Sequence, residues 1–402
     1  MVLAGGLILL GGLFVLLSRA ASLPTTYVMP NGTSVVRRFP GDPNPKATGK
    51  TYWGASVYIN GSHSLARHET PTGTSLSIHR SYYSWGDWNG TTSKMLSDVK
   101  DDLINNRLPH ISTKTPGGLP ANTAWRDVAA GKYDTALDDM LKKLDATGGP
   151  IWFSLYHEPE DNTYTGTGRE KCEKITTTHP TMDCEGTATD WRAMQQHVYD
   201  RMKALGTKNI AFMPTLMSWT WNTSSGRNPA DYWVAGIWDA YMIDHYAEKD
   251  ADVIQNLSAW TNFVKWIEAK GLPFGAAEWG NWGTTNLGAE MQSFFDWSLA
   301  NNKDMIAYEY FDVDVNGGIP LAGDQLMKFQ DILKNSVRVQ RIKDLGKPVA
   351  TTTTTSTITP TTTQSSTITP TTTIAPTTTI TPSTPPPTTS SPVANPGSKT
   401  KT

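Results

Sequence analysis

Short apolar runs alternate with longer amphipathic segments between about residues 50 and 340. The runs have the length and flanking turn residues typical of buried strands, which are expected near residues 51–58, 75–82, 108–112, 150–156, 209–216, 238–243, 273–277 and 305–311. Helical periodicity marks the segments between them, over residues 92–106, 123–146, 188–205, 229–235, 251–270, 286–301 and 324–343. This alternation predicts an α/β fold, a parallel (β/α)8 TIM barrel covering residues 48–345.

The N-terminal end departs from this pattern. Residues 1–18 carry no charge and are dominated by Leu, Val and Gly, and Arg19 follows them. A signal peptide and a membrane anchor both fit residues 1–20, with residues 2–18 as the segment that would enter the membrane. Both interpretations predict an extracellular protein, secreted or anchored at the cell surface. Residues 21–47 are expected to be an N-terminal linker.

The C-terminal end, residues 346–402, is a low-complexity tail. Residues 351–398 have no charged side chain and are almost entirely Thr, Pro, Ser and Ile. Frequent proline blocks helices and sheets, and the few apolar residues cannot bury enough surface to offset the entropy cost of ordering. A disordered, extended Thr/Pro-rich stalk is therefore expected.

Composition narrows the kind of partner. The formal net charge is −2 and only 18% of residues are charged, so no nucleic-acid partner is expected. A monomer is expected. Among the 15 Trp and 14 Tyr residues, those that follow strands are candidate platforms for sugar rings.

Two segments carry the chemistry, Ser-Leu-Tyr-His-Glu-Pro-Glu at 154–160 and Gly-Ala-Ala-Glu-Trp-Gly at 275–280. In a barrel, Glu158 and Glu278 fall at the carboxyl ends of strands 4 and 7, on the face where such barrels carry active sites. Cleavage of a glycosidic bond requires two such carboxylates, one to protonate the leaving oxygen and one to attack the anomeric carbon. This chemistry calls for a polysaccharide substrate and for no cofactor or metal.

With a glutamate at the end of strand 4 and another at the end of strand 7, the sequence resembles the clan A retaining glycoside hydrolases. His157 before the first glutamate makes it most similar to glycoside hydrolase family 26, which contains β-mannanases, lichenases and some β-1,3-xylanases. The resemblance spans roughly residues 50–340 and is supported by residues 52–55 (Tyr-Trp-Gly-Ala) and 244–246 (Asp-His-Tyr). It implies a retaining, endo-acting hydrolase of a β-mannan or β-glucan type polysaccharide. Residues 161–164 replace the aromatic continuation of the mannanases, so mannan, glucan and xylan all remain open.

The resemblance and the chemistry assign roles. Glu158 is the acid/base and must hold a proton, whereas Glu278 is the ionised nucleophile. Tyr246 matches the family tyrosine that bonds the nucleophile, and Arg80 is a second candidate donor to Glu278. His157 is expected to bond substrate hydroxyls, or else to be a buried strand-end histidine satisfied by backbone.

Aromatic residues after the strands are the expected sugar platforms. They are Trp85 and Trp88 after strand 2, Trp219 and Trp221 after strand 5, Trp279 and Trp282 after strand 7, and Tyr310 on strand 8. Trp279 is favoured because it adjoins the nucleophile.

Two cysteines, Cys172 and Cys184, lie in the segment after the first glutamate motif, and a disulfide between them is preferred over free thiols in an exported protein.

Two other functions compete. One is a non-catalytic carbohydrate-binding surface protein on a Thr/Pro stalk, which would have no use for a poised carboxylate pair. The other is a metal-dependent hydrolase, disfavoured because His110 and His245 are scattered and no second histidine stands at metal spacing from His157.

Overall fold

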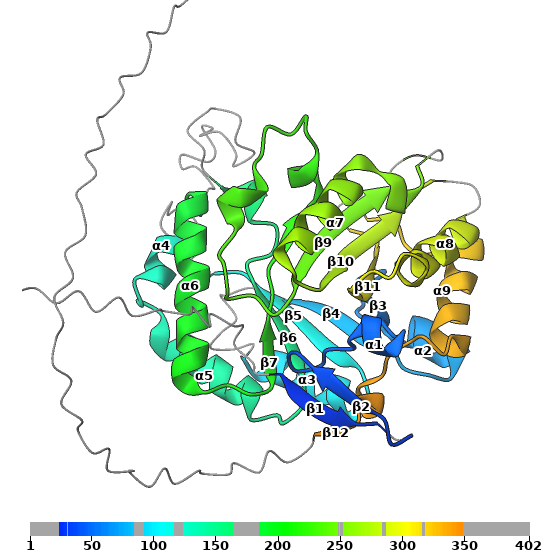
Figure 1. Cartoon of the computed structure of the whole chain (residues 1–402), viewed down its shortest axis with the longest axis horizontal. Coiled ribbons are helices and arrows are strands. Elements are labelled where there is room, and N and C mark those ends of the chain that lie inside the picture. The colour runs from blue at the N-terminus through cyan, green and yellow to red at the C-terminus, as the bar shows by residue number, and fades with distance from the viewer. Residues whose placement is uncertain are drawn as a thin grey trace, which may run out of the picture. The chain divides into compact units, whose positions relative to one another are not determined.

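The computed structural model describes residues 24–29, 31–83, 92–115, 124–163, 185–247, 249, 252–283, 287–315 and 318–348. Its main sheet is parallel throughout and runs in the order β7-β6-β5-β4-β3-β11-β10-β9-β8 (Figure 1). The strands are β3 (Tyr52–Tyr58), β4 (Ile78–Tyr83), β5 (Leu108–Thr113), β6 (Ile151–Leu155), β7 (Ile210–Phe212), β8 (Thr215–Met217), β9 (Tyr241–Ala247), β10 (Phe274–Asn281) and β11 (Met305–Val313).

The two end strands of this sheet belong to one stretch of chain, so the sheet closes into a barrel. β7 pairs with β6 and β8 pairs with β9, and only Met213 and Pro214 separate them. Proline has no N–H to donate to a ladder, which accounts for the interruption. The carbonyls of Phe212 and Pro214 still accept bonds from Asp239 and Met242, at 2.9 Å each. Counting 210–217 as one barrel strand confirms the expected (β/α)8 barrel.

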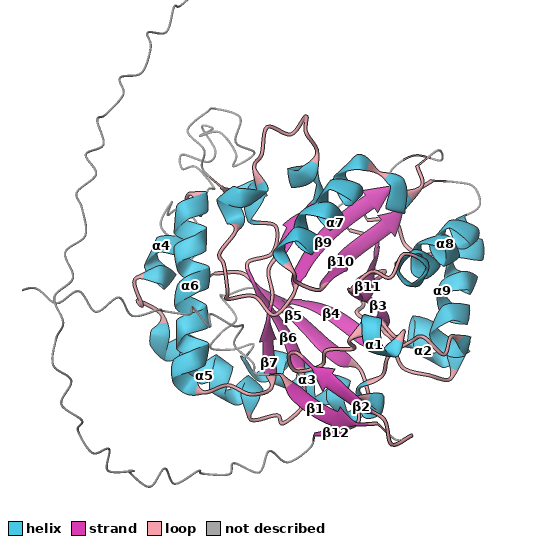
Figure 2. Cartoon of the chain, viewed as in Figure 1, coloured by secondary structure: helices cyan, strands magenta, loops and turns pink. Residues whose placement is uncertain are grey.

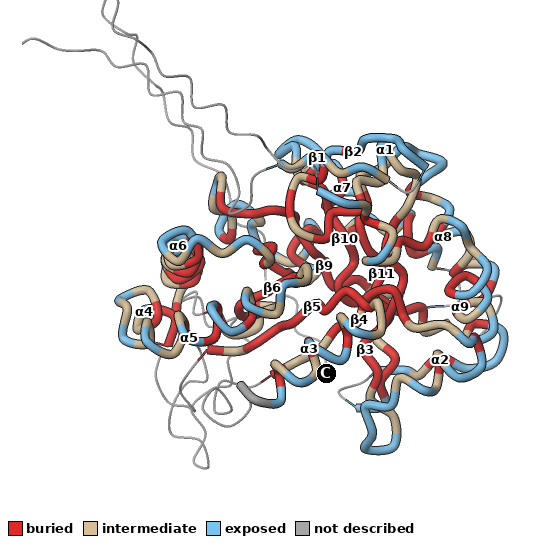
Figure 3. The backbone as a smooth tube through the Cα atoms, turned by 90° about the horizontal axis from the view of Figure 1, so that it is seen from below, coloured by how far each residue is buried: buried red, intermediate tan, exposed pale blue. Residues whose placement is uncertain are grey.

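Helices surround the barrel on its outer side (Figure 2). They are α2 (Ala66–Thr72), α3 (Thr92–Ile104), α4 (Ala124–Ala129), α5 (Asp134–Asp145), α6 (Ala188–Leu205), α7 (Ser258–Lys270), α8 (Leu287–Ala300) and α9 (Gly323–Asn335). Short 3-10 turns lie in the connections between strands and helices or between two strands: η2 (Pro159–Asn162), η3 (Ser218–Trp221), η4 (Pro229–Tyr232), η5 (Ile254–Asn256) and η6 (Ile342–Asp344). Strands and inward helix faces are buried, while the outer helix faces are exposed (Figure 3).

Three helical expectations differ from the structure. The single helix expected over 123–146 is divided into α4 and α5, because Gly131 between them has a φ of 77°. The segment 229–235 forms only η4, and α2 was not expected.

Part of the expected N-terminal linker is structured and closes the base of the barrel. β1 (Thr25–Val28) pairs with β2 (Ser34–Arg37) and with β12 (Lys347–Pro348), and α1 (Pro45–Thr48) follows. Phe39, 3% exposed, packs at the strand beginnings with Tyr52, Leu108 and Trp152. Burial of this aromatic ring ties the segment to the barrel.

Three expectations concern residues outside those described. They are the N-terminal segment 1–20, the disulfide between Cys172 and Cys184, and the expected tail from residue 349 onward; the first residues of that tail, 346–348, are described, and two of them form β12, which corrects the expected start of the tail. Within the described part of the chain, no helix has the length and apolar character needed to span a membrane.

Candidate active site

A strained turn presents Glu158 at the end of β6. Tyr156 and Glu158 have φ values of 59° and 50°, a region that side-chain-bearing residues seldom adopt. The turn is held by backbone bonds from Tyr156 N to Thr113 O (2.8 Å) and from Glu158 N to Thr215 O (2.9 Å). The Lys114 ammonium donates to the His157 carbonyl between them, at 2.9 Å. Such strain, of about 1–3 kcal/mol per residue, persists where the surrounding structure enforces it, typically at functional sites.

Glu278 lies on β10 and points into the barrel mouth. The hydroxyl of Tyr82 donates to its Oε1 at 2.6 Å, and the hydroxyl of Tyr246 donates to its Oε2 at 2.8 Å. The expected bond from Tyr246 is therefore present. The other donor is Tyr82 and not Arg80, so that expectation is wrong. Two phenol donors stabilise the ionised form of the carboxylate and fix its orientation.

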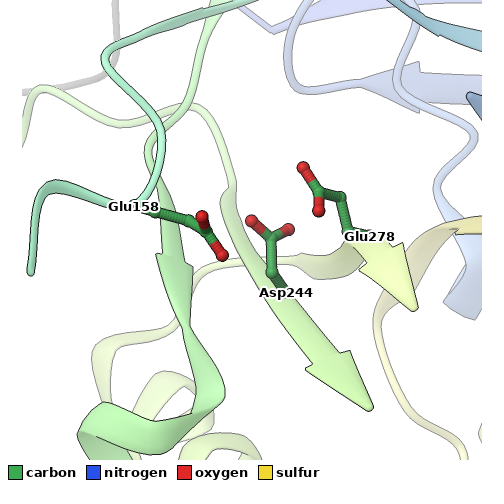
Figure 4. A group of neighbouring side chains, drawn as sticks. All are labelled: Glu158, Asp244 and Glu278. Carbon is green, nitrogen blue, oxygen red and sulfur yellow. The ribbon is translucent and has the colours of Figure 1, made fainter. Parts of the chain in front are cut away.

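Asp244 on β9 is a third carboxylate of the same site. It lies between Glu158 and Glu278 (Figure 4), and oxygens of all three carboxylates lie within 4.8 Å of one another. Burial, and then the charge of Glu278, raises the pKa of Glu158 to about 8. The same two causes raise the pKa of Asp244 well above its ordinary range. Glu158 therefore retains a proton at neutral pH, as a general acid requires.

Three carboxylates at this spacing could also hold a cation. The raised pKa values of Glu158 and Asp244 oppose that use, because a protonated carboxyl is a poor metal ligand. Both oxygens of Glu278 already accept phenol hydrogens. The donor set fits proton transfer better than metal binding.

Arg80 belongs to a buried polar chain beneath the carboxylates. Its Nη1 donates to His110 Nε2 at 2.7 Å, and His110 Nδ1 contacts Glu309 at 2.8 and 2.9 Å. Because arginine can only donate, His110 must accept at Nε2, carry its proton on Nδ1 and donate to Glu309. Burial, and then the charge of Arg80, lowers the pKa of His110, which agrees with a neutral ring.

Glu158 and Glu278 line a cavity of about 1260 Å³. His157, Tyr246 and Arg80 line it, as expected for substrate-contacting residues. His157 Nδ1 also lies 2.8 Å from the Ser112 hydroxyl, and burial lowers the pKa of His157, so its ring is neutral.

Several buried polar atoms of residues that line this cavity have no hydrogen-bond partner within the described part of the chain. They are Ser56 Oγ, Nε and Nη2 of Arg80 and Trp282 Nε1, and both oxygens of Asp244, beside the two glutamates, also have none there. Buried polar groups in native proteins are normally hydrogen-bonded, so these atoms are positioned for a hydroxyl-rich ligand.

Two expected sugar platforms point away from the cavity. Trp279 is 1% exposed and packs 5.2 Å from Phe294 of α8, and Tyr310 is fully buried and donates to Gln325 of α9. Side chains alternate along a strand, so the neighbour of an inward-facing glutamate faces the helix layer. The expectation for these two residues is wrong. Trp282, which was also expected, does line the cavity, with its ring 4.6 Å from Tyr246.

The remaining expected sugar platforms lie either away from the cavity or outside the described residues. Trp219 is 45% exposed on η3, whereas Trp221 is 5% exposed and packs 4.9 Å from Phe263 of α7. Neither is among the described residues that line the cavity, so the expectation for Trp221 is wrong. Trp85 and Trp88 lie outside the described residues.

Tyr82, Asp244 and Lys114 were not expected at the site. The period of two along β4 and β9 carried a signal for the first two, since Tyr82 shares the inward face with Arg80 and Asp244 shares it with Tyr246. No pattern in the sequence points to Lys114.

No family model and no curated protein sequence matches the chain. Solved structures are similar in fold. The catalytic domain of a GH26 endo-β-1,4-mannanase from Bacillus sp. JAMB-750 superposes with a TM-score of 0.50 at 12% identity, covering 75% of this chain and 90% of that one. A GH26 β-mannanase from Bacteroides ovatus gives a TM-score of 0.49 at 12% identity, covering 76% and 94%. For a GH26-CBM35 β-(1,4)-mannanase from Podospora anserina the values are 0.46, 15%, 78% and 71%. The barrel of this protein therefore resembles the catalytic barrel of a glycoside hydrolase family 26 enzyme.

Proposed function

We propose that this protein is a retaining glycoside hydrolase of the family 26 type that cleaves a β-linked polysaccharide of the mannan or glucan class by endo action. One observation carries the proposal: Glu158 with a raised pKa faces Glu278, which is held by two tyrosines, and their oxygens lie within 4.8 Å. Retaining enzymes place their carboxyls about 5–5.5 Å apart, whereas inverting enzymes need roughly 6.5–9.5 Å for a water molecule.

In the proposed first step, Glu278 attacks the anomeric carbon while Glu158 gives its proton to the leaving oxygen. In the second step, Glu158 takes a proton from water, which attacks the anomeric carbon and displaces Glu278, and this second inversion restores the original configuration. Asp244, whose two oxygens have no partner among the described residues, is placed to form a hydrogen bond with a hydroxyl of the sugar bound at Glu278.

The carbohydrate-binding alternative is less well supported. Burying carboxylates costs free energy unless they are paired, and a binding surface gains nothing from such a cluster. The mannanase neighbours favour mannan as the first substrate to test.

The test is a panel of purified β-mannan, β-glucan and β-xylan with reducing-end detection, followed by NMR of the first product anomer. Retention is expected. Glu278→Ala should abolish turnover, whereas Glu158→Ala should still form the glycosyl-enzyme from an aryl glycoside, with azide restoring release. An inverted first product would rule out this mechanism, and no cleavage of any β-glycan would rule out the function.

A further inference from the structure

The cavity continues beyond the carboxylates through a gap in the barrel wall. β3 and β4 pair at one position only, Ala55 with His79. Beyond it, β3 stays paired with β11 as far as Tyr58, and β4 stays paired with β5 as far as Tyr83. The two strands thus separate from each other while each remains a strand. Ser56 to Tyr58 and Arg80 to Tyr83 line one continuous cavity at this place.

The outer face of β4 is polar where barrel strands usually carry apolar residues under helices. His79 Nδ1 lies 3.0 Å from both oxygens of Asp102 on α3, and Tyr83 donates to Asp98 at 2.7 Å. α2 is only seven residues long and contains Pro71. This short helix leaves the outer face of β4 accessible to the cavity.

The position of this space relative to the reaction gives its role. Glu158 protonates the leaving oxygen, so the leaving part of a substrate lies on its side, at β6. Among the described residues that line the cavity, only His157 and Glu158 come from the turn after β6. The cavity extends the other way, from Glu278 toward β3 and β4, where the retained, glycone part of the chain must lie.

We propose that Tyr58, Glu69, His79, Ser81, Tyr83 and Asp102, here termed the outer pocket, form a glycone-side site for one neutral sugar unit of the substrate. The unit is either the next residue of the main chain or a branch attached to it. This proposal rests on the proposed function.

The chemistry of the lining selects a neutral sugar. The carboxylates can accept hydrogen bonds from sugar hydroxyls, and the hydroxyl and the imidazole can either accept or donate them. The Tyr58 ring, partly exposed beside His63 at 4.6 Å, offers an apolar face. The lining carries Glu69, Asp98, Asp101 and Asp102 against Arg107 and Lys94, an excess of negative charge that disfavours a uronic acid. Ser56, 4% exposed at the gap, has an Oγ with no partner in the described ranges and is a further buried group at the place where such a ligand would lie.

Ser81, His79 and Asp102 do not form a nucleophilic relay. The Ser81 hydroxyl lies 3.3 Å from Nε2 and 3.5 Å from Nδ1 of His79, and is therefore in line with neither nitrogen. These groups serve as a hydrogen-bonding wall.

The experiment compares Ser81→Trp, which fills the outer pocket, with Ser97→Trp on the exposed face of the neighbouring helix α3. kcat/KM is measured on short and long linear oligosaccharides and on branched ones. The ratio of long or branched to short kcat/KM should fall about tenfold or more in Ser81→Trp alone. Loss on long linear substrates identifies a main-chain unit, and loss confined to branched substrates identifies a branch. An unchanged ratio would overturn the proposal.

Two further measurements keep the test independent of folding and of the proposed function. Tyr58→Ala, which removes the apolar face without filling the space, should lower the same ratio. Neutral oligosaccharides titrated into Glu278→Gln should shift the NMR signals of the His79 ring, and this shift should be lost when Ser81→Trp is added. If the wild type cleaves no β-glycan but the shift appears, the proposed hydrolase function is wrong, whereas sugar binding in the outer pocket is supported. If no shift appears, the pocket is refuted.

Discussion

At the scale of single residues, the charge of Lys114 controls both the shape and the acidity of the acid/base. It holds the strained turn through the His157 carbonyl, and it opposes the rise in the pKa of Glu158 that burial and Glu278 cause. Since Glu158 acts as an acid only while protonated, activity should fall as the pH rises through about 8.

Lys114→Met should move this alkaline limb to higher pH. Removing a positive charge destabilises the ionised form of Glu158, so its pKa rises further, by about one unit or more. The check is the pH profile of kcat/KM, with Lys143→Met at an exposed ion pair as control. A limb that stays in place or moves to lower pH would contradict this role, whereas a general loss of activity alone would indicate only a structural one.

Tyr82→Phe and Tyr246→Phe should each lower kcat, because each removes a hydroxyl that holds Glu278. A hydrogen bond to a charged group is worth about 1.5–3 kcal/mol, which corresponds to roughly 10- to 100-fold in rate. In the double variant the two fold-losses of kcat should not simply multiply, because both hydroxyls donate to the same carboxylate. Tyr27→Phe, on β1 at the base of the barrel, is the control and should leave kcat unchanged.

At the scale of elements, alternation along a strand separates neighbouring side chains into different layers. Glu278 faces the cavity, Trp279 packs against α8, and Trp282, just beyond β10, returns to the cavity wall. Trp279 and Trp282, only three positions apart, thus lie in different layers.

Trp279→Ala should lower the free energy of unfolding by about 3–5 kcal/mol, as expected for a buried tryptophan. Trp282 is partly exposed, so Trp282→Ala should lower the free energy of unfolding less but raise KM for the polysaccharide. Chemical denaturation and steady-state kinetics on both variants decide the matter. The reverse pattern, with substrate affinity lost in Trp279→Ala alone, would restore Trp279 as a platform.

At the scale of the whole molecule, segments far apart in sequence close the base of the barrel. β12 pairs with β1, and Phe39 fills the space inside the strand beginnings. This end is remote from the carboxylates, which lie at the strand ends.

A fragment of residues 24–350 should therefore retain full stability and kcat/KM, whereas a fragment of residues 48–345 should unfold at lower temperature. Loss of Phe39 alone removes about 3 kcal/mol or more of burial and packing. Thermal unfolding followed by circular dichroism compares the two fragments. Equal midpoints would show that the small sheet and Phe39 contribute nothing to the barrel.

The sequence by itself determined the eight strand positions, the parallel barrel and the two glutamates at strand ends. These follow from local periodicity and from the rule that parallel strands end on one face. The direction of a side chain was available from the same periodicity, so Trp279 and Tyr310 could have been assigned to the helix layer, and Tyr82 and Asp244 to the site.

Only the tertiary structure decided the rest. The positive φ of Tyr156 and Glu158, the contact from Lys114 and the place of Arg80 beside His110 depend on residues brought together from different strands. The separation of β3 from β4 and the closure of the base by Phe39 depend on how the barrel packs as a whole. Such long-range contacts leave no period in the chain, because each is set by geometry between elements and not within one.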